Sequence, residues 1–245
     1  ESCLYCIMCY EYGGIIEDAV LMRFNAEKLW WVGGEAPTEQ WIYSKALGKR
    51  VEVRSHVDDI HVASIQGPKS REILQRVCDK DLSQVPFYGM VAEANVCGVP
   101  ATISRSGFTA ELGYDIYVGV ADGETLFRGL WQAGQSDGLS LCGSRALSIR
   151  RIEAAILNSG QDWDWTMTPY EIGLAWMLDF SKPFFYGKDA LARLRQEKPK
   201  RKLVGLRLEG IEAASEGDPI YWQEERAGVV TSATLSPALQ ASIAI

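Results

Sequence analysis

Two acidic residues, Glu17 and Asp18, stand side by side directly before an apolar run at 19–22. Paired carboxylates can share acid and base work, but adjacent side chains of a strand point to opposite faces, so these two cannot share a proton. Asp18, next to the apolar run, is the better candidate for partial burial. The plain alternative is a carboxylate that caps the turn at Gly13 and Gly14.

A third carboxylate, Glu111, lies in a polar loop that contains Gly107 and separates two expected strands. A loop on a rigid frame is the usual way in which a fold displays a binding group. A single glutamate in a loop is ordinarily solvated. Glu111 therefore acquires a binding role only if its loop borders a pocket.

A helix expected near 143–153 carries Arg150 and Glu153 three residues apart, which favours a structural ion pair. Tryptophans cluster soon afterwards, at 162–165 and at Trp176. Such a cluster can line a pocket for a flat ligand, although packing is the commoner role.

Cys3, Cys6 and Cys9 form a Cys-x-x-Cys-x-x-Cys run that could bind an iron-sulfur cluster. The fourth Cys and following Pro of the ferredoxin pattern are missing, and the segment alternates like a strand. His56 and His61 form no recognisable metal or nucleophile arrangement. We therefore expect buried strand cysteines, no metal, and a reduced cytoplasmic protein.

The chain has 245 residues, a net charge of −7 and scattered basic residues. Length and composition favour a globular protein with a substantial core and exclude a membrane span of about 20 apolar residues. No nucleic-acid or membrane partner is expected. Because the chain begins without Met and ends in the apolar run 241–245, it is expected to be part of a longer protein.

The first 55 residues are expected to be mostly β, with strands at 3–10, 19–24, 28–32 and 51–54 and a helix at 38–47. The next part is expected to contain strands at 62–66, 91–96, 100–104 and 114–118. Two amphipathic helices accompany these strands, one with Ile73 and Leu74 and one with Leu126, Phe127, Leu130 and Trp131 on its apolar face. This order matches part of a ferredoxin-like unit. A charged linker at 197–202 precedes short strands at 203–208, 220–222 and 227–232.

Seven motifs resemble, in the same order, those of the T-protein family of folate-dependent aminomethyltransferases and their relatives. Each motif alone is weak, but seven in register over nearly the whole chain are specific. They are Gly-Gly-Ile-x-x-Asp (13–18), Gln-Gly-Pro (66–68), Arg-x-Gly-Phe-Thr-x-Glu-x-Gly-Tyr (105–114), Gly-x-Arg-Ala-Leu-x-x-x-Arg-Ile-Glu (143–153), Thr-Pro-Tyr-Glu-Ile-Gly-Leu (168–174), Lys-x-x-Phe-x-Gly-Lys-x-Ala-Leu (182–191) and Thr-Ser-x-x-x-Ser-Pro (231–237).

The resemblance implies an α+β fold, a three-domain cloverleaf with ferredoxin-like split βαβ units and a C-terminal β-barrel module, cut at both ends. It implies a discontinuous folate-binding domain at 1–55 and 144–195. A ferredoxin-like domain would occupy 56–143, and a partial β-barrel domain would occupy 196–245.

By the same resemblance, Asp18 matches the family's catalytic carboxylate and Glu111 its pterin-binding glutamate. One carboxylate can accept the ring NH and the neighbouring amino group of a reduced pterin as a bidentate pair. Arg151, Tyr114 and Trp176 are the further predicted cofactor-binding residues, with tetrahydrofolate as the cofactor.

The chain departs from the glycine-cleavage members at 32–35, where Val-Gly-Gly-Glu replaces an Asn-rich stretch, and at its Glu17-Asp18 pair. Both departures favour the methyl-transferring branch, which includes demethylases of dimethylsulfoniopropionate and of methoxylated aromatic acids. The segment 151–173 is similar to the former. Lys-Pro-Phe at 182–184 replaces the Lys-Gly-Cys of the iron-sulfur repair relatives and argues against them.

We therefore expect a tetrahydrofolate-dependent methyltransferase that demethylates a small S-, O- or N-methylated compound and leaves methyltetrahydrofolate. Two alternatives stay open. One is aminomethyl transfer in the glycine cleavage system, with H-protein as the partner. The other is a folate-binding regulatory protein without turnover.

Overall fold

The computed structural model describes residues 2–33, 36–210 and 212–245. The chain forms two compact units, and each is assembled from two separate stretches of sequence. Unit 1 comprises Glu1–Tyr5 and Ala19–Cys142, and unit 2 comprises Cys6–Asp18 and Gly143–Ile245. Gly34 and Glu35, half of the stretch where the sequence departs from the glycine-cleavage pattern, lie outside the described residues.

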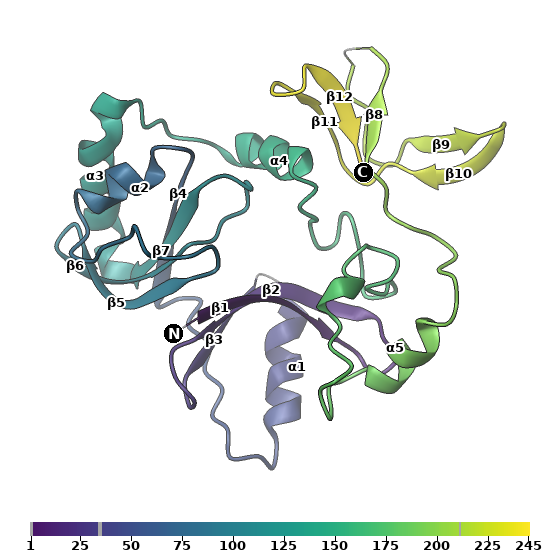
Figure 1. Ribbon diagram of the computed structural model, residues 1–245, viewed down its shortest axis with the longest axis horizontal. Helices are drawn as coiled ribbons and strands as arrows, with labels where there is room; N and C mark the ends of the chain where they lie inside the picture. Colours follow the sequence, from purple (N-terminus) through teal and green to yellow (C-terminus); the bar gives the residue numbers. More distant parts are fainter. Residues whose placement is uncertain (1, 34–35, 211) are drawn as a thin grey trace. The chain divides into compact units, whose positions relative to one another are not determined.

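A four-stranded antiparallel sheet in the order β4-β7-β6-β5 forms the centre of unit 1 (Figure 1). Its strands are β4 (Ile60–Gln66), β5 (Met90–Val96), β6 (Val99–Ser104) and β7 (Gly113–Gly119). The strands predicted at 91–96 and 100–104 are confirmed as β5 and β6, which pair as a hairpin. Its turn residues Cys97 and Gly98 both have positive φ, which a two-residue hairpin between right-twisted strands requires.

Helices α2 (Ser70–Gln75) and α3 (Gly123–Gly134) contact this sheet and share its main core cluster. Leu126 and Leu130 of α3 are buried, as the helical spacing predicted. Phe127 was expected on the same apolar face but is 51% exposed. Phe127 precedes Arg128 and lies at the solvent-exposed edge of the apolar face of α3, which is narrower than expected.

A second cluster within unit 1 joins Cys3, Met22 and Met90 to Tyr117 of β7, and Trp30 packs edge-on to the Tyr117 ring. Strands β1 (Ser2–Cys9), β2 (Ile15–Arg23) and β3 (Leu29–Val32) lie in the order β1-β2-β3 and are followed by helix α1 (Ala36–Ala46). These four elements agree with the sequence prediction, except that β2 begins four residues earlier.

The run at 51–54 was predicted as a strand, and this prediction is wrong. The run alternates like a strand, but it has no regular structure, and Val51 is 62% exposed. Alternation produces a strand only where a neighbouring strand satisfies the backbone hydrogen bonds.

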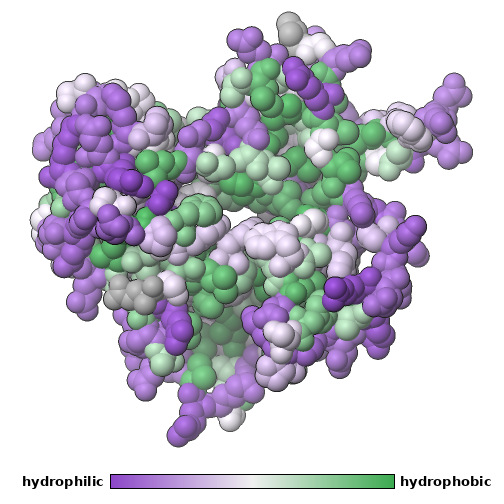
Figure 2. All heavy atoms as spheres, viewed as in Figure 1, coloured by the Kyte–Doolittle hydropathy of each residue, from purple (hydrophilic) through white to green (hydrophobic). Residues whose placement is uncertain are grey.

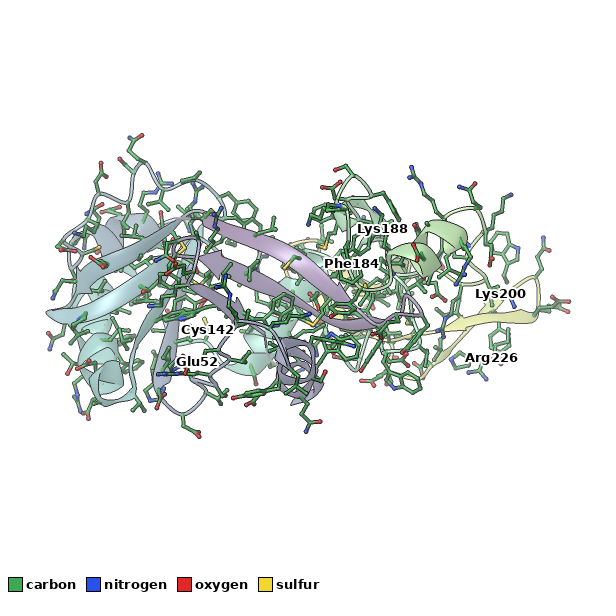
Figure 3. All side chains as sticks on the ribbon, turned by 90° about the horizontal axis from the view of Figure 1, so that it is seen from below. Glu52, Cys142, Phe184, Lys188, Lys200 and Arg226 are labelled. Atoms are coloured by element: carbon green, nitrogen blue, oxygen red, sulfur yellow. The ribbon has the colours of Figure 1, made fainter. Side chains whose placement is uncertain are left out.

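Unit 2 contains two helices and five short strands besides the ends of β1 and β2 within its described residues. The helices are α4 (Ser144–Glu153) and α5 (Lys188–Leu194); Figure 3 marks Lys188, the first residue of α5, and Phe184 in the segment before it. The strands are β8 (Leu206–Leu208), β9 (Pro219–Trp222), β10 (Glu225–Val229), β11 (Ala233–Ser236) and β12 (Ala241–Ala244).

β9 and β10 form a hairpin, and a separate sheet has the order β11-β12-β8. Hydrophobic residues reach the visible surface over these C-terminal strands (Figure 2), and Leu235 and Leu239 are about half exposed. Three single-turn 3-10 helices complete the regular structure that is described, at Val120–Asp122, Gln135–Asp137 and Ala175–Met177. Among the described residues, no helix has the length and apolar character needed to cross a bilayer.

Candidate active site

Asp18 follows a tight turn whose two glycines are required by the packing of unit 2. Gly13 has φ of +94°, in the left-handed region that favours glycine. A Cβ on Gly14 would lie 2.3 Å from the carbonyl oxygen of Trp165. The next residue, Ile15, is fully buried, and its N–H donates to the carbonyl of Met167 at 3.0 Å. The Gly-Gly-Ile motif therefore anchors the start of β2 in the core.

This anchoring changes the expected burial of the acidic pair. Glu17 is only 2% exposed, and Asp18 is half-buried. Asp18 is thus partly buried, as expected, but Glu17 is buried more deeply, because β2 already begins at Ile15 and carries Glu17 through the packed part of the unit. Alternation along β2 sends the two carboxylates to opposite faces, and Asp18 keeps partial access to solvent.

Glu111 lies in unit 1, in the segment between β6 and β7, and its side chain is exposed. Its backbone N–H donates to the hydroxyl of Thr109 at 3.2 Å. Thr109 is buried and donates that hydroxyl to the side-chain oxygen of Gln66 at 2.7 Å. An accessible carboxylate on an anchored loop is suited to accept two neighbouring N–H donors of a ligand.

Asp115 of β7 is a half-buried acid that was not predicted from the sequence. One carboxylate oxygen accepts the Ser64 hydroxyl at 2.7 Å, and the other accepts the Ser106 hydroxyl at 2.8 Å. Burial raises the pKa of Asp115, and the two hydroxyls oppose this rise. Asp115 also contributes, after burial, to a raised pKa of Tyr117 on the same strand. The one indication of Asp115 in the sequence was that it directly follows the 105–114 motif.

Arg151 is 2% exposed, and its guanidinium is occupied by unit 2 itself. It donates to Asp162 Oδ2 at 2.5 Å, to Gln161 Oε1 at 2.9 Å and to Ser232 Oγ at 2.8 Å. Asp162 in turn accepts the hydroxyls of Ser232 and Thr231 on its other oxygen. The geometry is that of a structural ion pair, and the predicted contact of Arg151 with folate stays a prediction.

Tyr114 and Trp176, the two predicted aromatic ligands of the cofactor, have opposite environments. Tyr114 is completely buried in the core of unit 1, and its hydroxyl accepts a hydrogen bond from Arg71 at 3.0 Å. Tyr114 is thus inaccessible where it stands and acts as a core residue. Trp176 belongs to unit 2 and is 71% exposed, and its predicted contact with the cofactor stays a prediction.

Glu153, at the end of α4, binds residues at the Ser-Pro end of the motif at 231–237. Its carboxylate pairs with Arg150, as expected, and also accepts the Ser236 hydroxyl at 2.6 Å and the Ala238 N–H at 3.3 Å. Burial acts to raise the pKa of Glu153, but these hydrogen bonds and Arg150 outweigh it, and the pKa is lowered. The motif at 231–237 is therefore fixed to α4 and to the Asp162 network.

Cys3, Cys6 and Cys9 lie in strand β1, as predicted, but only Cys3 and Cys9 are buried, and Cys6 is half-buried. Burial raises the pKa of Cys3 to about 11, with a smaller effect of Asp115, and burial raises that of Cys9 to about 12. Both thiols are therefore harder to ionise than an exposed cysteine thiol. Within the described part of the chain, no three His, Cys, Asp or Glu side chains are grouped as metal ligands.

The model of the GCVT N-terminal domain matches residues 1–182, and that of the glycine cleavage T-protein C-terminal barrel domain matches residues 201–245. The chain belongs to the glycine cleavage T-protein family.

Two curated relatives illustrate the range of the T-protein family. An aminomethyltransferase of Thermotoga neapolitana is 37% identical over 99% of this chain, which covers 67% of that protein. A trimethylamine-oxide aldolase of Ruegeria pomeroyi is also 37% identical over 99% of this chain, which covers 32% of that much longer protein.

The crystal structure of aminomethyltransferase T from Bartonella henselae has a TM-score of 0.87 to this structure at 24% identity. The match covers 99% of this chain and 66% of that one. The predicted α+β T-protein fold is confirmed. The chain thus spans about two thirds of the aminomethyltransferases that it matches and about one third of the aldolase.

Proposed function

We propose that the chain is the folate-binding part of a tetrahydrofolate-dependent one-carbon transferase. The observation that carries this proposal is Glu111, an exposed carboxylate on a loop that buried hydrogen bonds hold in place. A reduced pterin presents a ring NH and an amino group side by side, and a carboxylate can accept both. Glu111 would bind the pterin in this way.

Asp18 would act on the reacting nitrogen. Bound tetrahydrofolate supplies a nucleophilic nitrogen that accepts the one-carbon unit. That nitrogen gains positive charge as its new bond to carbon forms, and a fixed carboxylate stabilises this charge. Asp18 suits the role because it is half-buried and follows a turn that is anchored in the core.

We propose an aminomethyl group as the first choice of one-carbon unit. The T-protein relatives named aminomethyltransferase support it, among them those of Thermotoga neapolitana and Caldanaerobacter subterraneus, at 37% and 34% identity. Their names favour the glycine-cleavage alternative over the demethylase function expected from sequence. In that case H-protein would be the partner that delivers the aminomethyl group.

A methylated amine derivative is the second candidate donor. It is supported by the relative named trimethylamine-oxide aldolase, which matches 99% of this chain as well as any aminomethyltransferase above. The S- and O-methylated compounds that the sequence predicted as donors are tested in the same experiment.

The donor is identified by offering tetrahydrofolate together with one donor at a time. The donors are aminomethyl-loaded H-protein, trimethylamine oxide, dimethylsulfoniopropionate and a methoxylated aromatic acid. Folate products are separated by chromatography, with Asp18→Asn as the inactive control. We expect ammonia and a folate product from loaded H-protein alone. Methyltetrahydrofolate from a methylated donor would instead support the demethylase function, and folate binding without any product would support a regulatory protein.

A further inference from the structure

The loop that carries Glu111 is built around a side chain from another strand. Gln66 is the last residue of β4, 45 positions before Glu111 in the sequence, and its carboxamide lies against the loop. Gln66 is the first residue of the Gln-Gly-Pro motif, one of the seven motifs shared with the T-protein family.

The carboxamide of Gln66 makes three hydrogen bonds. Its nitrogen donates to the Ser64 hydroxyl at 3.0 Å and to the Ser106 carbonyl oxygen at 3.3 Å. Its oxygen accepts the Thr109 hydroxyl at 2.7 Å. Ser64 must accept here because it donates its own proton to Asp115, so the orientation of the amide is fixed by its partners.

Two glycines of the Glu111 loop make room for this amide. A Cβ on Gly107 would lie 2.3 Å from the Gln66 carboxamide, and a Cβ on Gly113 would lie 2.1 Å from it. Neither position tolerates a side chain while Gln66 stays in place. Gln66 thus explains Gly113 of the 105–114 motif, and it explains Gly107 together with the positive φ of that residue.

The hydrogen bonds continue from Gln66 to the backbone of Glu111. The Thr109 hydroxyl, which donates to Gln66, accepts the N–H of Glu111 at 3.2 Å. Thr109 and Ser106 are each 6% exposed, so these contacts are shielded from competing water. Displacing the amide would release both sides of the loop at once.

We propose that Gln66 is a positioning residue for folate binding and acts through Glu111. Its carboxamide fixes the loop so that the Glu111 carboxylate is presented in one orientation before the ligand arrives. Preorganisation of this kind raises affinity, because the free energy of binding does not have to offset the entropy lost in ordering the loop. The inference rests on the proposed pterin-binding role of Glu111.

A double-mutant cycle tests the inference, with the dissociation constant of tetrahydrofolate measured by calorimetry on the 245-residue chain. The variants are Gln66→Met, Glu111→Ala and the double variant. Gln75→Met is the matched control, because Gln75 is also half-buried in unit 1 and bonds the backbone at Lys80 and Leu82. We expect Gln66→Met to raise the dissociation constant roughly tenfold. In the Glu111→Ala background, we expect the same Gln66→Met substitution to raise the dissociation constant by less than about twofold, because the effects of coupled residues are not additive.

Gln66→Glu provides a second variant of nearly identical shape for use in the same cycle if Gln66→Met does not fold. It keeps the acceptor for Thr109 and loses both N–H donors. Its affinity for folate, relative to the native chain, should improve as the pH falls and the new carboxyl regains a proton to donate.

Three results would overturn these assignments, and they are distinguishable. If Gln66→Met binds tetrahydrofolate like the native chain, or if its effect is equally large with and without Glu111, the positioning role of Gln66 is wrong while the proposed function stands. If Glu111→Ala itself binds tetrahydrofolate normally, the proposed role of Glu111 fails.

Discussion

At the scale of single residues, Asp18 and Arg151 differ in how deeply the fold buries them. Asp18 is half-buried at the anchored end of β2, whereas the Arg151 guanidinium is surrounded by protein acceptors. The sequence motifs located both residues, but they could not distinguish them, because the partners of Arg151 lie up to 81 residues away.

We predict that Asp18→Asn separates binding from turnover. The amide keeps the size of the side chain but removes the charge that stabilises the reacting nitrogen. Turnover with the active donor should fall by about 100-fold or more, while tetrahydrofolate affinity should change less than about threefold. Steady-state kinetics with calorimetry checks both values, and a loss confined to affinity would contradict the catalytic role.

We predict that Arg151→Met destabilises unit 2 by about 3–5 kcal/mol, because it leaves the Asp162 carboxylate buried without its cation. Urea unfolding measures this loss. The matched control is Arg145→Met, since Arg145 is exposed on the same helix. If Arg151→Met and Arg145→Met unfold at the same urea concentration, Arg151 is not the structural residue that its contacts indicate.

At the scale of elements, sequence patterns predicted most strands and helices but not the contacts that give them a role. Strands β5 and β6 and helix α3 were predicted because turn residues and apolar spacing are local signals. The strand wrongly predicted at 51–54 has the opposite cause. Whether a segment pairs with another strand depends on residues far away in the sequence. For the same reason the contacts of Gln66 and Asp115 could not be predicted from the sequence.

We predict that Asp115 makes the stability of unit 1 depend on pH. Burial raises its pKa in the folded chain above the ordinary value of 3.8, so the folded state holds the proton more tightly than the unfolded state. The stabilisation is complete below the ordinary value and is lost as the pH rises through the raised one. The loss is about 1.4 kcal/mol for each pH unit between the two values.

Urea unfolding of the native chain and of Asp115→Asn between about pH 3 and pH 7 checks this prediction. Relative to the native chain, Asp115→Asn should gain stability as the pH rises across this range. A stability difference that is constant with pH would show that the carboxyl titrates alike in both states. Asp79→Asn, on an exposed residue of unit 1, is the control.

At the scale of the whole molecule, family membership could be predicted from seven motifs because their order spans both units of the fold. The donor of the one-carbon unit could not be predicted from the sequence. The departure at 32–35 favoured a methyl donor, whereas the named relatives include both aminomethyltransferases and an aldolase. Substrate choice depends on a few side chains, whereas the motifs report on the shared frame.

The central claim is that Glu111 binds a reduced pterin, and calorimetric titration of the chain with tetrahydrofolate tests it most directly. The native chain should bind one equivalent, and Glu111→Ala should weaken binding at least about tenfold. Glu93→Ala, on another exposed glutamate of unit 1, should bind like the native chain. Undiminished binding by Glu111→Ala would contradict the account.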